Sequence, residues 1–357
     1  MSKRSRLYQY LIVFAINIVF ISAALAIYSQ LLLREYRSID LQVEGDWLIQ
    51  GDETLGYVRA RNAVSTRTDR NTATTYQIFS DHRGARVNKT DQPTKDTAAI
   101  VSIGGSFTEG SGIQNEATFT SRLGSKFDAS VANFGVGSYG TVQSLQLLQR
   151  NRDLNPRVVI YGFISDHLRR NLSPCAPAYG PYCLSVSHVD FDQAKQPFLQ
   201  TPLREYPQEL YQSFLQEVAW EHGSLGDDIK WATRLTLKKF EDKSIYGYDN
   251  SSESQAKGMT FLIDQMFEVT DSIGAQLVVV YIPYLERGQT NPPPAELLQA
   301  LTPGVIFVDM TARISEHYQV DGNPSLKIHE LDGHPNEIGH DLIAEEIYRV
   351  LQERSIL

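Results

Sequence analysis

Residues 100–110 read Ile-Val-Ser-Ile-Gly-Gly-Ser-Phe-Thr-Glu-Gly. The run begins with mostly apolar, β-branched residues and continues through two glycines into a serine. This pattern predicts a buried strand that ends in a tight turn, with Ser106 at the carboxyl end of the strand. Ligands bind at that edge in open α/β sheets, so a serine there is well placed to act as a nucleophile. An ordinary strand-to-loop turn has the same composition, so other parts of the chain must distinguish the two interpretations.

The alternation of strand and helix patterns continues along the chain. Further strands are predicted from the apolar runs at 130–134, 157–164, 275–282 and 305–308. Helices are predicted from apolar residues at helical spacing in 118–126, 141–150, 259–273 and 341–352. This order is typical of an α/β fold with a doubly wound, mostly parallel sheet flanked by helices, as in flavodoxin-like proteins.

The N-terminal segment predicts a membrane anchor. Lys3, Arg4 and Arg6 precede residues 7–33, which are almost free of charge and long enough to span a bilayer as a helix. The basic flank predicts a cytoplasmic N-terminus, with the rest of the chain outside. The segment Ala24-Leu25-Ala26 resembles a signal-peptide cleavage site, but the length of the apolar run favours an uncleaved anchor.

Three regions follow from these patterns: an anchor at 1–37, a β-rich connector at 38–96 and a main domain at 97–357. Short strands are expected in the connector at 47–49, 57–59 and 76–79. We expect the connector to be a spacer packed on the core, although a substrate-docking lobe is the alternative.

An irregular insertion at about 172–254 interrupts the main domain and carries several prolines and aromatic residues. Its segment 231–243 predicts an amphipathic helix with a basic face, for which a solvated surface is favoured over a lid. The two cysteines, Cys175 and Cys183, lack the neighbours of a zinc site. An oxidising compartment would favour a local disulfide between them.

Composition limits the class of partner. The 357-residue chain carries a net charge of −9, which argues against binding nucleic acid. Gly135, Gly137 and Gly140 give G-x-G-x-x-G without the distant acidic residue of a dinucleotide site. We therefore expect these glycine N–H groups to donate hydrogen bonds to an oxyanion, and no cofactor.

A base and an acid for Ser106 are found near the C-terminus. Asp332 and His334 lie in a short polar segment before the last predicted helix, and a nucleophilic serine needs both groups. A metal site would add His340, but that residue lies about a turn into the helix, so no metal is expected.

These motifs together resemble the SGNH (GDSL-like) hydrolases, and in particular their membrane-anchored, exported members. Gly104–Gly110 resembles the block with the nucleophile, 133–137 the second block and 162–166 the third. Asp332-Gly333-His334-Pro335-Asn336 is similar to the last block. The resemblance implies a Ser106–His334–Asp332 triad and an oxyanion hole formed by Ser106, Gly137 and Ser165.

The sequence departs from the family pattern at two places. Ser165 stands where the family carries an oxyanion-hole asparagine, and a hydroxyl donates over a shorter reach. Asn171, a turn later, is a candidate substitute, and Asp166 and Asn171 are candidate substrate-binding residues. In addition, one residue rather than two separates the acid from the base.

The resemblance and the predicted anchor imply an esterase tethered to the inner membrane, with its catalytic domain in the periplasm. Its expected substrate is an O-acyl, most simply acetyl, group on an envelope or exported glycan, which it would hydrolyse or transfer. Envelope polysaccharide-assembly proteins are its expected partners. The alternative is a catalytically weak SGNH domain that binds glycan or scaffolds an envelope assembly.

Overall fold

The computed structural model describes residues 3–33, 41–69, 72–89, 93–176, 184–202, 229, 232–233, 236, 250–285, 291–330 and 332–357. The chain forms two compact units. Helix α1 (Lys3–Leu33) belongs to the smaller unit, and the central sheet with its flanking helices belongs to the larger one.

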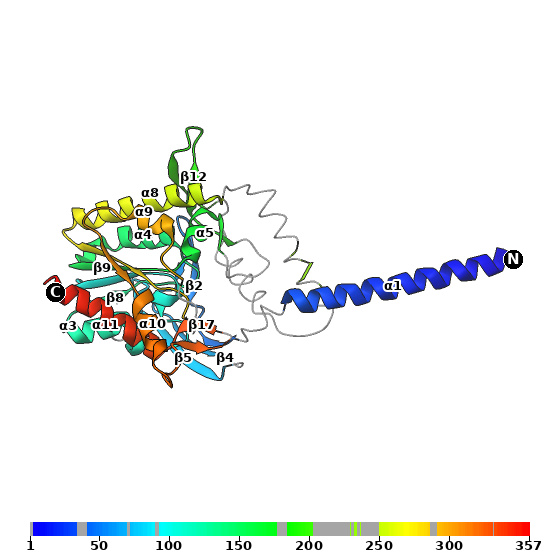
Figure 1. Cartoon of the computed structure of the whole chain (residues 1–357), viewed down its shortest axis with the longest axis horizontal. Helices are drawn as coiled ribbons and strands as arrows, with labels where there is room; N and C mark the ends of the chain where they lie inside the picture. Colours follow the sequence, from blue (N-terminus) through cyan, green and yellow to red (C-terminus); the bar gives the residue numbers. More distant parts are fainter. Residues whose placement is uncertain are drawn as a thin grey trace. The chain divides into compact units, whose positions relative to one another are not determined.

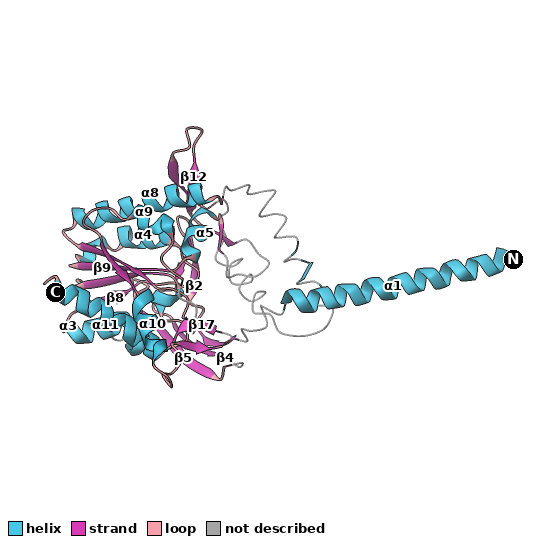
Figure 2. Ribbon diagram, viewed as in Figure 1, coloured by secondary structure: helices cyan, strands magenta, loops and turns pink. Residues whose placement is uncertain are grey.

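A nine-stranded sheet organises the larger unit, with the strand order β1-β4-β5-β6-β8-β7-β9-β14-β15 (Figures 1 and 2). The parallel strands are β8 (Val131–Asn133), β7 (Ile100–Gly104), β9 (Val158–Phe163), β14 (Gln276–Tyr281) and β15 (Ile306–Asp309). Every residue of β7 and β9 is buried, which explains their continuous apolar runs. The predicted mostly parallel α/β sheet is confirmed.

The order of these strands reverses at β7. From β7 the chain passes to β8 on one side and then to β9 on the other, so β7 lies at a topological switch point. Parallel pairing brings the carboxyl ends of all three strands to one edge, with Gly104 of β7 opposite Gly162 of β9. Crevices at such switch points bind ligands in open α/β folds.

Most strands of the predicted connector join the main sheet. Its strands β1 (Leu41–Gly45), β4 (Val64–Asp69), β5 (Thr74–Ser80) and β6 (Arg86–Val87) extend the same sheet in antiparallel fashion. The junction is a single antiparallel residue pair, Arg86 with Asn133. Strands β2 (Ile49–Asp52) and β3 (Gly56–Arg59) form a separate hairpin. The expected boundary at residue 96 therefore falls inside one compact unit, because these strands complete the sheet.

Helices cover both faces of the sheet (Figure 1). One face carries α3 (Phe119–Phe127), α10 (Thr311–Gln319) and α11 (Glu337–Glu353). The other carries α4 (Thr141–Arg150), α5 (Asp166–Leu172), α8 (Ser252–Ser272) and α9 (Ala295–Ala300). The short α2 (Ser106–Glu109) and the 3-10 turns Asn115–Ala117 and Arg152–Leu154 connect strands to helices. The main core packs α3, α10 and α11 against β7, β9, β14 and β15.

Three small hairpins complete the described structure. They are β10 (Cys175–Ala176) with β11 (Leu184–Ser185), β12 (His188–Phe191) with β13 (Pro197–Gln200), and β16 (Lys327–His329) with β17 (Asp332–Pro335). Cys183 and most of the predicted helix at 231–243 lie outside the described residues, so the predicted disulfide and that helix stay predictions.

Helix α1 matches the predicted apolar segment. Its window Ile12–Ser29 has a mean hydropathy of 2.3, so the helix is long and apolar enough to cross a membrane. A signal sequence has the same properties.

Candidate active site

The turn that carries Ser106, the candidate nucleophile, lies at the end of β7 and leads into α2, which we call the nucleophile helix. Ser106 is the first residue of α2, and Gly104 before it has φ +153°. A Cβ on Gly104 would lie 2.2 Å from Oγ1 of Thr108 and 2.8 Å from the carbonyl oxygen of Gly162. A side chain at position 104 would therefore collide with both neighbours, so glycine is required for this turn.

The candidate base His334 and the candidate acid Asp332 both lie on strand β17. Residues i and i+2 of a strand point to the same side, so Asp332 and His334 share one face of the hairpin. Nδ1 of His334 lies 2.5 Å from Oδ1 of Asp332, and Nε2 of His334 lies 2.8 Å from Oγ of Ser106. In a strand, one intervening residue places two side chains on the same face, so this spacing brings Asp332 and His334 within hydrogen-bonding distance.

Several contacts fix the orientation of the imidazole. The backbone N–H of His334 donates to Oδ1 of Asp332 at 3.0 Å, and the ring of Phe107 packs at 5.3 Å between centroids. Asn336 caps α11 by accepting a hydrogen bond from the N–H of Gly339, and its amide donates to the carbonyl oxygen of Lys327 in the partner strand. The hairpin is therefore anchored to the last helix directly after His334.

The carboxyl group of Asp332 is held in its charged form. Burial acts to raise the pKa of Asp332, but hydrogen bonds from the side chain and backbone of His334, together with the charge of that imidazole, outweigh it and lower the pKa. An ionised Asp332 selects the His334 tautomer with its proton on Nδ1, which leaves Nε2 free to accept a proton from Ser106.

The second block packs directly against the nucleophile helix. The side chain of Asn133 donates to the carbonyl oxygen of Thr108, and a Cβ on Gly135 would lie 2.3 Å from the N atom of Glu109. Gly137 follows, and its carbonyl oxygen accepts a hydrogen bond from the hydroxyl of Tyr57 at 2.8 Å. This tyrosine from β3 was not singled out in the sequence.

The third block places Ser165 at the same sheet edge, at the start of α5. Oγ of Ser165 lies 3.4 Å from the hydroxyl of Tyr281, and Tyr281 also donates to the carbonyl oxygens of Asn291 and Pro292. Asp166 is partly exposed and pairs with Arg170 at 3.3 Å.

Asn171 does not join the other candidate site residues. It is 1% exposed, its Oδ1 accepts from the N–H of Thr141, and its amide donates to Oγ1 of Thr141. Its hydrogen-bonding groups are used to hold the start of α4, so the prediction that Asn171 replaces the missing asparagine is wrong.

A buried histidine next to the nucleophile turn is not a second base. A Cβ on Gly105 would lie 3.0 Å from Nε2 of His167, and Nδ1 of His167 bonds the hydroxyl of Tyr161 at 2.7 Å. Burial, with help from the charge of Arg170, lowers the pKa of His167 well below its usual value. His167 is therefore neutral and structural.

Arg86 of β6 holds the far end of the nucleophile helix. It is fully buried and donates to four carbonyl oxygens, those of Gln77, Glu109, Gly110 and Ile113. Burial lowers the pKa of Arg86 to about 10, so the guanidinium stays charged at neutral pH. Cations at a helix C-terminus stabilise the unsatisfied carbonyl groups there.

A second arginine, Arg59 of β3, pairs with Glu109 inside the protein. Nη2 of Arg59 lies 2.7 Å from Oε1 of Glu109 and also donates to the carbonyl oxygen of Gly135, while Ser111 donates to Oε2 of Glu109 at 2.6 Å. Burial alone would raise the pKa of Glu109, but the charges of Arg59 and Arg67 and the Ser111 hydroxyl lower it to about 2. The N-terminal strands thus fix the helix that presents Ser106.

His340 is a core residue. It is fully buried, stacks on Phe119 and accepts a hydrogen bond from the N–H of that residue at 3.1 Å through Nδ1. Burial lowers the pKa of His340 to about 3. Within the described ranges, no cluster of three or more His, Cys, Asp or Glu side chains is arranged to hold a metal ion.

Comparisons with known proteins give only distant likenesses. No protein-family model matches the chain. No curated protein matches it either.

The solved structures that show a distant likeness to this chain include three described as lipolytic or esterase proteins. A protein assigned to the G-D-S-L lipolytic family from Desulfitobacterium hafniense is 14% identical, with coverage of 71% of this chain and 98% of the other and a TM-score of 0.33. An acetyl xylan esterase from the rumen bacterium Butyrivibrio proteoclasticus is 11% identical, with coverage of 83% and 72% and a TM-score of 0.37. A carbohydrate esterase family 2 enzyme from the fungus Myceliophthora fergusii is 12% identical, with coverage of 88% and 91% and a TM-score of 0.36.

Proposed function

We propose that this protein is a serine esterase that acts on O-acyl groups of a glycan. The observation that carries the proposal is the continuous hydrogen-bonded chain from Ser106 through His334 to Asp332. A serine, an imidazole and a carboxylate in this order form a nucleophile, its general base and the group that orients the base.

In the proposed reaction, Oγ of Ser106 attacks the acyl carbonyl carbon while Nε2 of His334 takes the hydroxyl proton. The N–H groups of Ser106 and Gly137, with the Ser165 hydroxyl, stabilise the negative charge on the carbonyl oxygen. Collapse of this intermediate breaks the bond to the sugar oxygen, which leaves with the proton from His334. An acyl group remains on Ser106.

The second half of the reaction releases the acyl group. Water, activated by His334, attacks the acyl-enzyme and gives the free acid. A sugar hydroxyl in the place of water gives acyl transfer, and the exclusion of water from the site decides between the two outcomes. An acetyl group is the simplest acyl group for this site.

The predicted anchor supplies the location in this proposal. Helix α1 would hold the enzyme in the inner membrane with the larger unit in the periplasm, where it would meet envelope or exported glycans and the proteins that assemble them. A disulfide between Cys175 and Cys183 would be compatible with that compartment.

A second candidate function is a glycan-binding or assembly scaffold with little catalytic activity. The position of Ser165 favours it, because the Ser165 hydroxyl lies beside Tyr281 and Asn171 does not supply the missing amide donor. Loss of one oxyanion donor lowers the rate by about 100-fold or more.

The test uses the full chain purified in a mild detergent. We expect the wild type to hydrolyse p-nitrophenyl acetate and to be labelled by a fluorophosphonate probe. Ser106→Ala should lose the labelling and lower kcat by roughly 10⁴-fold or more. Ser125→Ala, which changes an exposed serine of α3, is the matched control and should retain both properties. A folded wild type that neither reacts with the probe nor hydrolyses the ester would favour the scaffold.

A further inference from the structure

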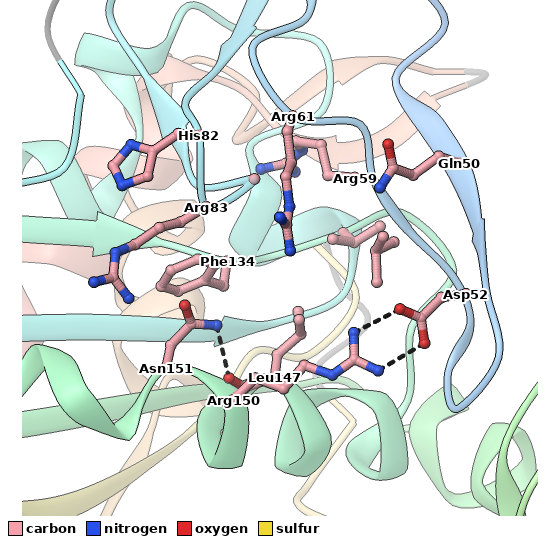
Figure 3. A pocket seen from close by; sticks show the side chains of 13 residues that line it. Gln50, Asp52, Arg59, Arg61, His82, Arg83, Phe134, Leu147, Arg150 and Asn151 are labelled. Carbon is pink, nitrogen blue, oxygen red and sulfur yellow. Dashed lines mark hydrogen bonds and ion pairs between the residues drawn. The ribbon is translucent and has the colours of Figure 1, made fainter.

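A cavity lies among the N-terminal strands and α4, and Ser106, Asp332 and His334 do not line it. Its volume is about 310 Å³, near the lower limit for small-ligand pockets in proteins. The β2–β3 hairpin, the turn after β5, the segment after β8 and the end of α4 supply its walls (Figure 3). We call it the arginine pocket, after its lining residues Arg59, Arg61, Arg83 and Arg150.

Three of these four arginines have carboxylate partners. Arg59 pairs with Glu109, Arg83 with Asp153, and Arg150 with Asp52 through two contacts of 2.6 and 2.7 Å. Asp81, which also lies nearby, accepts hydrogen bonds from three backbone N–H groups and does not line the pocket.

Arg61 is the exception. It is exposed, and within the described part of the chain no hydrogen bond or ion pair engages its side chain. Figure 3 shows the Arg61 side chain at the centre of the view, with His82 and Arg83 on one side and Gln50 and Asp52 on the other. Because Glu109, Asp153 and Asp52 pair with the other three guanidinium groups, the guanidinium of Arg61 is the one left to pair with a negatively charged group of a ligand.

Arg59 also leaves donors unused. Its side chain is 2% exposed, and among the described residues neither Nε nor Nη1 has a hydrogen-bond partner. Buried donors without an acceptor cost free energy, so an acceptor supplied by a ligand would be stabilising here.

The remaining polar lining suits hydroxyl groups. Gln50, His82 and Asn151 each add hydrogen-bonding atoms, and the Asn151 amide donates to the carbonyl oxygen of Leu147. Val58 and Val136 supply an apolar part of the wall. Charge-assisted hydrogen bonds at one point and neutral ones around it are typical of sites for small, charged, hydroxylated ligands.

We propose that the arginine pocket binds a singly charged oxyanion carried on a sugar-like skeleton, namely a carboxylate or a sulfate ester of a monosaccharide. The guanidinium of Arg61 pairs with the oxyanion, and Gln50, His82 and Asn151 bond the hydroxyls. This site is separate from the triad, and its ligand binding does not depend on the catalytic role of Ser106.

Isothermal titration calorimetry on the full chain in detergent tests the proposal with three matched probes. D-glucuronate carries a carboxylate, D-glucose 6-sulfate carries a sulfate ester, and D-glucose carries no charge. We expect at least one of the two anionic sugars to bind and glucose to bind at least tenfold more weakly. Binding of glucuronate alone, of the sulfate alone or of both supports the proposal and identifies the anion.

Variants of exposed arginines locate the site. Arg61→Gln should weaken binding of the anionic sugar by about tenfold or more, because it removes the unpaired charge. Arg61→Lys should restore part of the affinity. Arg152→Gln is the matched control, since Arg152 is also exposed and lies two residues after Arg150 but does not line the pocket.

Two results would overturn the proposal. One is the absence of a preference for either anionic sugar over glucose. The other is an equal loss of affinity in Arg61→Gln and Arg152→Gln, which would indicate a general effect of surface charge.

Discussion

The carboxyl ends of the parallel strands β7 and β9, together with the β16–β17 hairpin, carry the candidate reactive groups, whereas the N-terminal antiparallel strands β3 and β6 carry residues that hold the nucleophile helix in place. Ser106 and Ser165 follow β7 and β9, and the side chains of Asp332 and His334 on β17 are 24% and 29% exposed. Arg59 and Arg86, from β3 and β6, are almost fully buried and contact the backbone or carboxylate of the nucleophile helix. Substitution of the candidate reactive residues should therefore lower the reaction rate, whereas substitution of the buried supporting residues should lower the stability of the fold.

We call the candidate reactive residues the reactive side and the residues that hold the nucleophile helix the supporting side. The largest effect, a loss of reaction rate, is expected on the reactive side from Asp332→Asn. An amide at this position favours the wrong tautomer of His334, so kcat should fall by roughly 10³- to 10⁴-fold while the free energy of unfolding changes little. Steady-state hydrolysis of p-nitrophenyl acetate and thermal unfolding measure the two quantities. Asp321→Asn, at an exposed turn, is the control. A stability loss as large as the rate loss would mean that Asp332 is a structural residue.

The second-largest effect is a loss of stability, which we expect from Glu109→Gln on the supporting side. Removal of one partner of a buried ion pair leaves Arg59 uncompensated, at a cost of about 3 kcal/mol or more. The exposed Glu116→Gln is the control and should be neutral. Denaturant unfolding at pH 7 gives the free energies.

The same residue predicts a pH dependence with a defined sign. The pKa of Glu109 is about 2 in the folded protein and near 4.5 in the unfolded chain. Its contribution to stability is therefore complete above pH 4.5 and disappears as the pH falls from 4.5 to 2. The wild type should lose its stability advantage over Glu109→Gln in this window, and a constant difference between the two proteins would contradict the assignment.

The smallest effect is expected from Ser165→Ala. If the hydroxyl donates to the oxyanion, its removal should lower kcat about tenfold with little change in KM, which is less than the cost of an ideal donor. Tyr281→Phe removes the neighbouring hydroxyl and is the comparison. An equal loss of rate in both variants would indicate that Ser165 acts by positioning Tyr281, and no loss in Ser165→Ala would remove it from the oxyanion hole.

The reactive side was predictable from the sequence because its signals are local. The apolar run 100–104, the glycines after it and the Asp332–His334 pair each occupy a few consecutive residues, and β7, β9 and β14 are buried as their composition indicates.

The supporting side was not predictable, for two physical reasons. Strand β6 has two residues and meets β8 through one residue pair, which is too short for any alternating pattern. Arginine is rarely buried, so nothing in the sequence marks Arg59 and Arg86 as interior residues.

Asn171 was misassigned because its contact with Thr141 depends on how α4 and α5 pack.

The contribution of Arg86 to the nucleophile helix has a consequence for synthesis of the chain. Arg59 and Arg86, which hold the nucleophile helix, lie before Ser106 in the sequence, and the candidate base His334 lies more than two hundred residues after it. During translation Ser106 is therefore made long before the imidazole that is placed to take its proton. A chain that ends before residue 334 would therefore contain Ser106 without its candidate base.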